Sequence, residues 1–126
     1  MYKSIYLKRG KEESLRRFHP WVFSGAIQKM DEGISEGSLV RVLSEKGDFI
    51  AVGHYQIGSI AVRVLSFRDI QIDDDFWESR LESALQMRLA LGIADNPQNN
   101  TYRLVHGEGD NLPGLVIDCY GPTAVM

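Results

Sequence analysis

Hydrophobic and polar residues alternate in several short stretches of the first half of the chain, as they do in β-strands with one buried face. This alternation predicts strands at residues 4–8, 39–43, 49–55 and 60–65. Because the strands are short and separated by turns with glycine or aspartate, they favour a small antiparallel sheet or barrel. A brief helix is expected at residues 11–18, and it should end before Pro20, whose ring disfavours a helical conformation in the preceding residue.

Trp21, Val22 and Phe23 form an apolar group directly after this proline. We interpret the group as a core anchor, because Val22 and Phe23 adjoin the indole of Trp21. Trp21 could instead stack on a nucleic-acid base, and the sequence leaves the two roles open.

The second half of the chain begins with a helical pattern over residues 73–92. Three aspartates at residues 73–75 supply an N-cap and negative charge at the positive end of the helix dipole, and Gly92 is a natural C-cap. An apolar stripe follows at three- and four-residue spacing: Phe76, Trp77, Leu81, Ala84, Leu85, Leu89 and Leu91. We interpret the stripe as a packing surface. Strands are then expected at residues 102–106 and 114–120, and the start of another at 123–126.

Composition places the chain among ordinary soluble proteins: it has 126 residues, of which 44% are hydrophobic and 25% are charged. No apolar run approaches the roughly 18 residues of a membrane helix, and no apolar stretch follows the basic N-terminus as in a secretory signal. The single cysteine, Cys119, cannot pair within the chain, and we expect it to pack as a small apolar group. We therefore expect a cytoplasmic protein without a membrane partner.

The net charge of −3 conceals a basic segment. Residues 1–29 hold seven basic and two acidic residues, and RNA phosphates respond to such local charge rather than to the net charge. The candidate RNA-binding residues are Lys8, Arg9, Gly10, Lys11, Arg16, Arg17, His19 and Arg63, with Arg68 as a weaker addition. Glycine at position 10 would let RNA approach the backbone closely. The alternative is a basic face that simply contacts solvent.

Motifs for catalysis and metal binding are largely missing from the sequence. Gly107-Glu108-Gly109 lacks the third glycine of a dinucleotide loop, and the three histidines lack metal-ligand spacing. One polar cluster, His106, Glu108, Asp110 and Asp118, could serve a small hydrolase or hold a cation, although such residues more often cap turns. We expect no catalytic residue, metal or cofactor in this chain.

Two longer strings carry a resemblance to a known family. LKRGKEESLRRFHPWVFSGAI (residues 7–27), continued by GSLVRV and GDFIAVGHYQIGSIAVRVLS, resembles the PUA domain of ribosomal-RNA cytosine-5 methyltransferases. YRLVHGEGDNLPGLVIDCYG (residues 102–121) resembles the opening of the central α+β domain of that family. These enzymes use S-adenosylmethionine to methylate carbon 5 of a cytosine in large-subunit ribosomal RNA, with the donor site and catalytic cysteines in a C-terminal domain.

The resemblance implies a mainly β or α+β chain. Residues 1–70 would form a PUA-like β-barrel with short helices, and residues 73–126 a linking helix and the first strands of an incomplete α+β domain. The chain would be an N-terminal fragment that positions ribosomal RNA for a catalytic domain it does not contain, with S-adenosylmethionine bound only by the full-length parent. The alternative function is a protein-interaction or dimerisation module that uses the apolar stripe, and a homodimer stays open.

Overall fold

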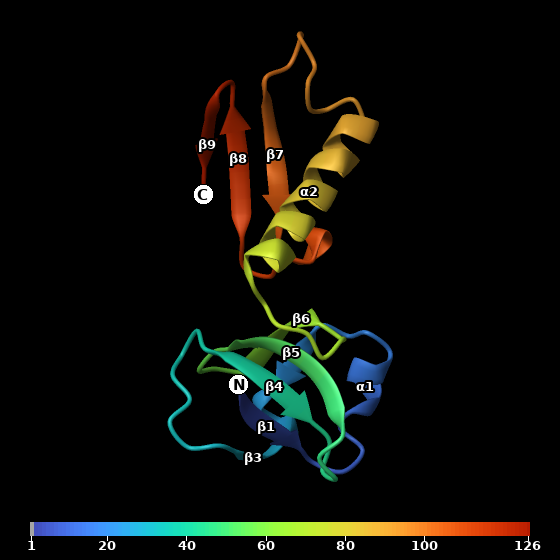
Figure 1. Cartoon of the computed structure of the whole chain (residues 1–126), viewed down its shortest axis with the longest axis vertical. Coiled ribbons are helices and arrows are strands. Elements are labelled where there is room, and N and C mark those ends of the chain that lie inside the picture. Colours follow the sequence, from blue (N-terminus) through green and yellow to red (C-terminus); the bar gives the residue numbers. More distant parts are fainter. Residues whose placement is uncertain (1) are drawn as a thin grey trace. The chain divides into compact units, whose positions relative to one another are not determined.

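The computed structural model describes residues 2–126, which divide after Ile70 into two compact units (Figure 1). The first unit contains a six-stranded sheet in the order β2-β6-β5-β4-β1-β3. Its strands are β1 (Lys3–Leu7), β2 (Trp21–Phe23), β3 (Ile27–Met30), β4 (Leu39–Leu43), β5 (Phe49–Tyr55) and β6 (Ile60–Ser66). A short helix, α1 (Glu13–Arg16), precedes β2, and a 3-10 turn, η1 (Ser24–Ala26), follows it.

A short connection forces this sheet to curl. β2 and β3 are its two edge strands, and in a flat sheet five strand spacings would separate them by about 24 Å. Only η1 joins them, and a connection of that length spans at most about 14 Å. The sheet therefore bends into a half-barrel, which confirms the barrel-like, mainly β fold expected from the alternation.

The concave side of the half-barrel holds the hydrophobic core of the first unit. In β1 alternate residues, Ile5 and Leu7, are fully buried, whereas β5 buries the continuous run 50–53. The buried cluster comprises Ile5, Leu7, Leu15, Val22, Val40, Val42, Ile50, Ala51, Val62 and Val64. Leu15 is the one residue of α1 in this cluster, so the helix lies against the barrel through a single side chain.

Three details of the first unit differ from the sequence predictions. The sheet is mixed rather than antiparallel, because β1 runs parallel to β4. The helix predicted at residues 11–18 is only α1, since the chain leaves the helical conformation at Phe18. Neither β2 nor β3 was predicted as a strand: residues 21–23 were interpreted as an apolar anchor, and the residues of β3 are mostly exposed and show no alternation.

The second unit packs one helix, α2 (Asp74–Ala90), on an antiparallel sheet of three strands. The strands are β7 (Thr101–His106), β8 (Val116–Tyr120) and β9 (Thr123–Val125), with a 3-10 turn, η2 (Gly107–Asp110), between the first two. The predicted N-cap is confirmed: the carboxylate of Asp73 accepts the Phe76 N–H at 3.0 Å.

The apolar stripe of α2 was predicted correctly only in its first part. Ala84 is buried with Val105 and Leu112, and Leu81 packs against that cluster. Further along the stripe, Leu89 and Leu91 are 38% and 67% exposed, so these two residues do not pack in the core of the unit. Within residues 2–126, no helix combines the length and apolarity needed to span a membrane.

Candidate nucleic-acid interface

The turn between β1 and α1 presents its backbone and its basic side chains to solvent. The Lys11 N–H donates to the Lys8 carbonyl at 3.0 Å and closes the turn. Gly10 has a φ of +81°, which glycine adopts without strain, and a Cβ placed there would meet no atom within 4 Å. Lys8, Arg9 and Lys11 are all exposed, so this turn offers cations beside an accessible stretch of backbone.

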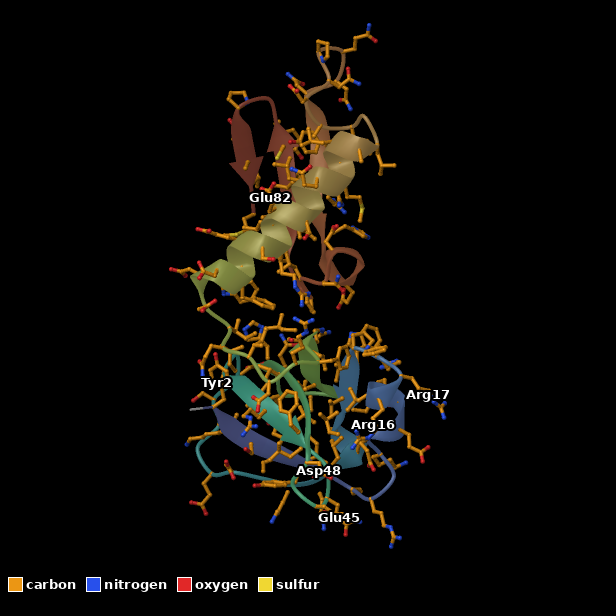
Figure 2. The ribbon with its side chains drawn as sticks, turned by 45° about the vertical axis from the view of Figure 1, so that its right-hand side comes forward. Tyr2, Arg16, Arg17, Glu45, Asp48 and Glu82 are labelled. Atoms are coloured by element: carbon orange, nitrogen blue, oxygen red, sulfur yellow. The ribbon has the colours of Figure 1, made fainter. Side chains whose placement is uncertain are left out.

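Two further arginines extend this surface along α1. Because Leu15 faces the core, Arg16 and Arg17 lie on the solvent side, and Figure 2 shows Arg17 extending away from the end of the helix. We refer to five residues together as the basic patch: Lys8, Arg9, Lys11, Arg16 and Arg17.

Within the described part of the chain, the basic side chains of this patch have no carboxylate partner, unlike several arginines elsewhere in it. Arg41 pairs with a carboxylate of the same unit, and Arg88 and Arg103 do so in the second unit. Across residues 2–126, none of the five patch side chains has a hydrogen bond or an ion pair to another side chain. Five charges that no internal carboxylate neutralises remain available to an external anion.

The chain leaves α1 through a Schellman motif, the hydrogen-bond pattern that commonly ends helices at a left-handed residue. The Phe18 N–H donates to the Leu15 carbonyl at 2.9 Å, and the His19 N–H to the Ser14 carbonyl at 3.0 Å. Phe18 occupies the left-handed position with a φ of +66°. Its ring is 71% exposed and meets the Phe67 ring edge-on at a centroid distance of 5.2 Å.

Three neighbouring rings, which we call the aromatic row, come from His19 just before strand β2 and from Trp21 and Phe23 within it. The Trp21 ring centroid lies 5.9 Å from that of His19 and 6.4 Å from that of Phe23. The core-anchor interpretation holds fully for Val22, which is 2% exposed, whereas Trp21 is half-buried with its indole nitrogen covered and Phe23 turns outward. Phe23 is 49% exposed.

A groove of about 420 Å³ lies between α1 and β2 in the first unit. It is lined by Lys11, Ser14, Leu15, Trp21, Val22, Phe23, Gly25 and Ala26. The basic patch and the aromatic row therefore meet at one surface, with Lys11 on one wall and Trp21 and Phe23 on the other. Ser14, Gly25 and Phe23 were not among the predicted site residues, since only the fold brings η1 and α1 together.

Arg63 lies beside the aromatic row rather than in the basic patch. It is directly opposite Trp21 on the neighbouring strand β6, and its guanidinium donates to the side-chain oxygen of Gln56. Arg68 is farther along the chain, in the exposed segment after β6. His54, which pairs with Arg63 across β5 and β6, is half-buried, and this burial lowers the pKa of its imidazole, so it is neutral at pH 7.

Two carboxylates of the polar cluster in the second unit, Asp110 and Asp118, are held in ion pairs. Asp110 accepts two hydrogen bonds from Arg88, and Asp118 pairs with Arg103 at 2.8 Å. These arginines lower the pKa of both carboxyl groups, so neither is suited to accept a proton as a general base near neutral pH. Among residues 2–126, no three His, Cys, Asp or Glu side chains are grouped as a metal would require.

A cavity along α2 in the second unit has the wrong charge for phosphate. It measures about 560 Å³ and is lined by α2 and Leu104, including Asp75, Glu78 and Glu82, the last of which Figure 2 marks. Gly107 and Gly109 do not form the glycine-rich loop of a dinucleotide site, because they lie within η2 and an antiparallel strand follows rather than a helix.

Comparison with known proteins links both units to one group of sequences. The family model described as a PUA-like domain matches residues 5–67. The chain is 40% identical over 124 residues to ribosomal RNA large subunit methyltransferase I of Erwinia tasmaniensis, an alignment that covers 97% of this chain and 31% of that protein. The protein of the same name from Klebsiella pneumoniae is 37% identical over 128 residues, with 32% of its length covered. The chain thus spans about a third of the length of these relatives.

One solved structure resembles the fold over nearly the whole chain. A protein of Streptococcus mutans described as a SAM-dependent methyltransferase aligns with a TM-score of 0.78 and 18% sequence identity. The alignment covers 98% of this chain and 32% of that protein. At this identity the likeness concerns the fold, in which both units have counterparts.

Proposed function

Because the chain belongs to the family of PUA-like domains, we propose that residues 1–70 are an RNA-binding domain whose contact surface is the basic patch with the adjoining groove. The observation that carries this proposal is the set of five basic side chains without an internal partner. RNA affinity depends largely on such cations, because each phosphate contact releases condensed counterions.

The individual roles follow from position. Lys8, Arg9, Lys11, Arg16 and Arg17 contact phosphates. Gly10 lets the RNA backbone approach the turn, since no side chain stands in the way. His19, as part of the aromatic row, and Arg63, beside that row, add polar contacts there. This assignment keeps every predicted site residue, but divides them between the basic turn with α1 and the outer face of β2 and β6.

The larger proposal concerns the protein to which such a domain belongs. We infer that the chain acts within an S-adenosylmethionine-dependent methyltransferase of the cytoplasm that modifies carbon 5 of a cytosine in large-subunit ribosomal RNA. The names of the 40% and 37% identical relatives support ribosomal RNA of the large subunit as the substrate. Residues 73–126 would be the linking helix and first strands of an α+β domain, and the donor would be bound by residues outside this chain.

Salt dependence tests the RNA-binding surface. Replacing Arg16 and Arg17 together by alanine should weaken binding to all RNA sequences and lower the slope of log K against log salt by about 1–1.5, the loss expected for two phosphate contacts. Fluorescence anisotropy with a single-stranded RNA over a range of potassium chloride concentrations measures this slope. The matched control is Lys46→Ala, which removes an exposed cation in the turn between β4 and β5. An unchanged slope in the double variant would remove the proposed patch.

The methyltransferase proposal has a separate test. Bisulfite sequencing of large-subunit ribosomal RNA, from cells with and without the gene that encodes this chain, should show one 5-methylcytosine lost on deletion and restored by complementation. An unchanged pattern would contradict the activity while leaving the RNA-binding proposal standing.

A protein-interaction module remains the second candidate, and a feature of α2 favours it. Met87, Leu89 and Leu91 are 48%, 38% and 67% exposed, so the last turn of the helix offers an apolar surface. If this surface mediates dimerisation, light scattering at rising concentration will give twice the monomer mass and Leu91→Asp will abolish the increase. A constant monomer mass rules out the homodimer.

A further inference from the structure

Phe18 is an exposed aromatic residue in a position that normally holds glycine. Its φ of +66° lies in the left-handed region, which a bulky residue rarely adopts. Helix α2 ends with the same pair of hydrogen bonds, and there the left-handed residue is Gly92. A strained, bulky residue at such a position is a reason to look for a function of its side chain.

The surroundings of the ring fix its orientation without covering it. The two backbone hydrogen bonds of the Schellman motif hold the Phe18 backbone, and the edge-on contact with Phe67 supports one part of the ring. The side chain is nonetheless 71% exposed. A ring that is both held and exposed can receive a flat partner with little further loss of side-chain freedom.

The charge around the ring indicates the kind of partner. Arg16 and Arg17 directly precede Phe18, and both are exposed and without a side-chain partner among residues 2–126. An apolar protein surface would gain nothing from these two cations. A nucleotide matches both features, because its base can stack on the ring while its phosphate meets a guanidinium.

We propose that Phe18 is a stacking platform for an unpaired base, so that the substrate of this surface is single-stranded rather than fully duplex RNA. The inference rests on the proposed RNA-binding function and deepens it. In a regular duplex both faces of each base are already covered by neighbouring bases. The bound RNA must therefore contain a loop, a bulge or a strand end.

The test uses the full chain and a labelled single-stranded RNA of about 12 nucleotides, within the usual size of such sites. We expect Phe18→Gly to weaken binding about 5- to 100-fold with no change in the salt slope, because stacking releases no counterions. Phe18→Trp should bind at least as tightly as wild type. Phe18→Leu, which keeps an apolar side chain but loses the ring, should bind like Phe18→Gly.

A second measurement reads stacking directly. When the RNA carries 2-aminopurine as its unpaired base, we expect quenching of its fluorescence on binding to wild type and to Phe18→Trp, and little quenching with Phe18→Gly. The control is Ile57→Gly, which removes another highly exposed apolar side chain (73%) from the turn between β5 and β6. Wild-type chain should also prefer the single strand to a duplex of the same length.

The outcomes separate the two proposals. If Phe18→Gly binds within about twofold of wild type while the Arg16 and Arg17 double variant loses affinity, the stacking platform is wrong and the RNA-binding surface stands. Equal loss for Phe18→Gly and Ile57→Gly, or wild-type affinity for Phe18→Leu, would also overturn stacking. If neither the double variant nor Phe18→Gly alters RNA binding, both proposals fail.

Discussion

Phe18 is an exception among the residues of this chain that adopt a left-handed backbone, because the others are glycine, aspartate or asparagine. Among the described residues, three other than glycine have a positive φ: Phe18, Asp95 and Asn111. Aspartate and asparagine tolerate this conformation because their short polar side chains can hydrogen-bond locally, whereas a large ring gains no such compensation. Phe18 therefore stores strain of about 1–2 kcal/mol in the cap that ends α1.

The strain can be measured by comparing two substitutions that both remove the ring. Phe18→Gly relieves the left-handed backbone and Phe18→Ala does not, so we expect the glycine variant to be more stable by about 1 kcal/mol. Urea unfolding followed by circular dichroism gives the difference. The reverse comparison, Gly92→Ala, should destabilise the second unit by a similar amount of about 1 kcal/mol, and equal stability of the Phe18 variants would contradict the argument.

At the scale of elements, one carboxylate connects three parts of the second unit. Asp110 in η2 accepts hydrogen bonds from Arg88 on α2, one of them at 2.9 Å, and from the His106 N–H at the end of β7. The side chains of Asp110 and Arg88 are only 3% and 11% exposed. Arg88 also donates to the Arg103 carbonyl at 2.9 Å, so helix, turn and strand are held together by one guanidinium and its partner.

Removal of this carboxylate should destabilise the unit and alter its response to acid. Asp110→Asn leaves Arg88 buried without a counter-charge, which we expect to cost about 3 kcal/mol at pH 7. The hydrogen bonds from Arg88 lower the pKa of Asp110 below its ordinary value of 3.8. Its contribution is thus complete above that value and is lost as the pH falls through the lowered pKa of the folded state.

Urea unfolding at pH 7 and near pH 3 checks both statements. The free energy of unfolding of the wild-type chain should fall from pH 7 to pH 3, and that of the Asp110→Asn variant should fall by a smaller amount. Asp118→Asn is the matched control, because its pair with Arg103 lies at the exposed face of the sheet and should change stability little. Equal destabilisation by the two substitutions would show that burial of Asp110 is unimportant.

The sequence predicted elements well where the pattern was regular. α2 carries an aspartate cap, a periodic stripe and a terminal glycine, and its observed bounds lie within two residues of the prediction. β3 escaped prediction because an edge strand exposes both faces and needs no alternation. β2 has only three residues, and whether Trp21 or Val22 faces the core depends on pairing with β6, which is a property of the fold.

The basic residues of the candidate site could be predicted from the sequence, but the groove beside them could not. The basic residues are clustered in the sequence itself, so their cationic character needs no structure to be seen. The groove is formed by side chains from α1, β2 and η1, and Phe23 and Gly25 belong to it only because the half-barrel curls. The left-handed conformation of Phe18 has no sequence signal, since glycine is the residue that normally marks it.

At the scale of the whole molecule, the two units differ in charge, and each has its own hydrophobic core. The net charge is −3, yet the basic patch belongs to the first unit and the acidic cavity to the second. Each unit also has a hydrophobic cluster of its own. RNA affinity should therefore depend on the packing of the first unit alone.

Leu112→Ala tests this division. Leu112 is 1% exposed within the cluster of the second unit, and its truncation should destabilise that unit by about 2–5 kcal/mol. Hydrogen exchange should show faster exchange in β7 and β8 and unchanged exchange in β4 and β5. RNA affinity below the unfolding temperature should stay at the wild-type value, and a large loss would mean that the second unit contributes to binding.

The pairing of β2 has a consequence for the order in which the chain folds. β2 pairs only with β6, and Val22 is about 40 residues from its partner Val62 along the sequence. Contacts between such distant residues require closure of a long loop and form late. During synthesis on the ribosome, the aromatic row must wait for β6 to emerge. A nascent chain that stops before Ile60 would contain Trp21 and Phe23 but not the strand that holds them in place as the wall of the groove.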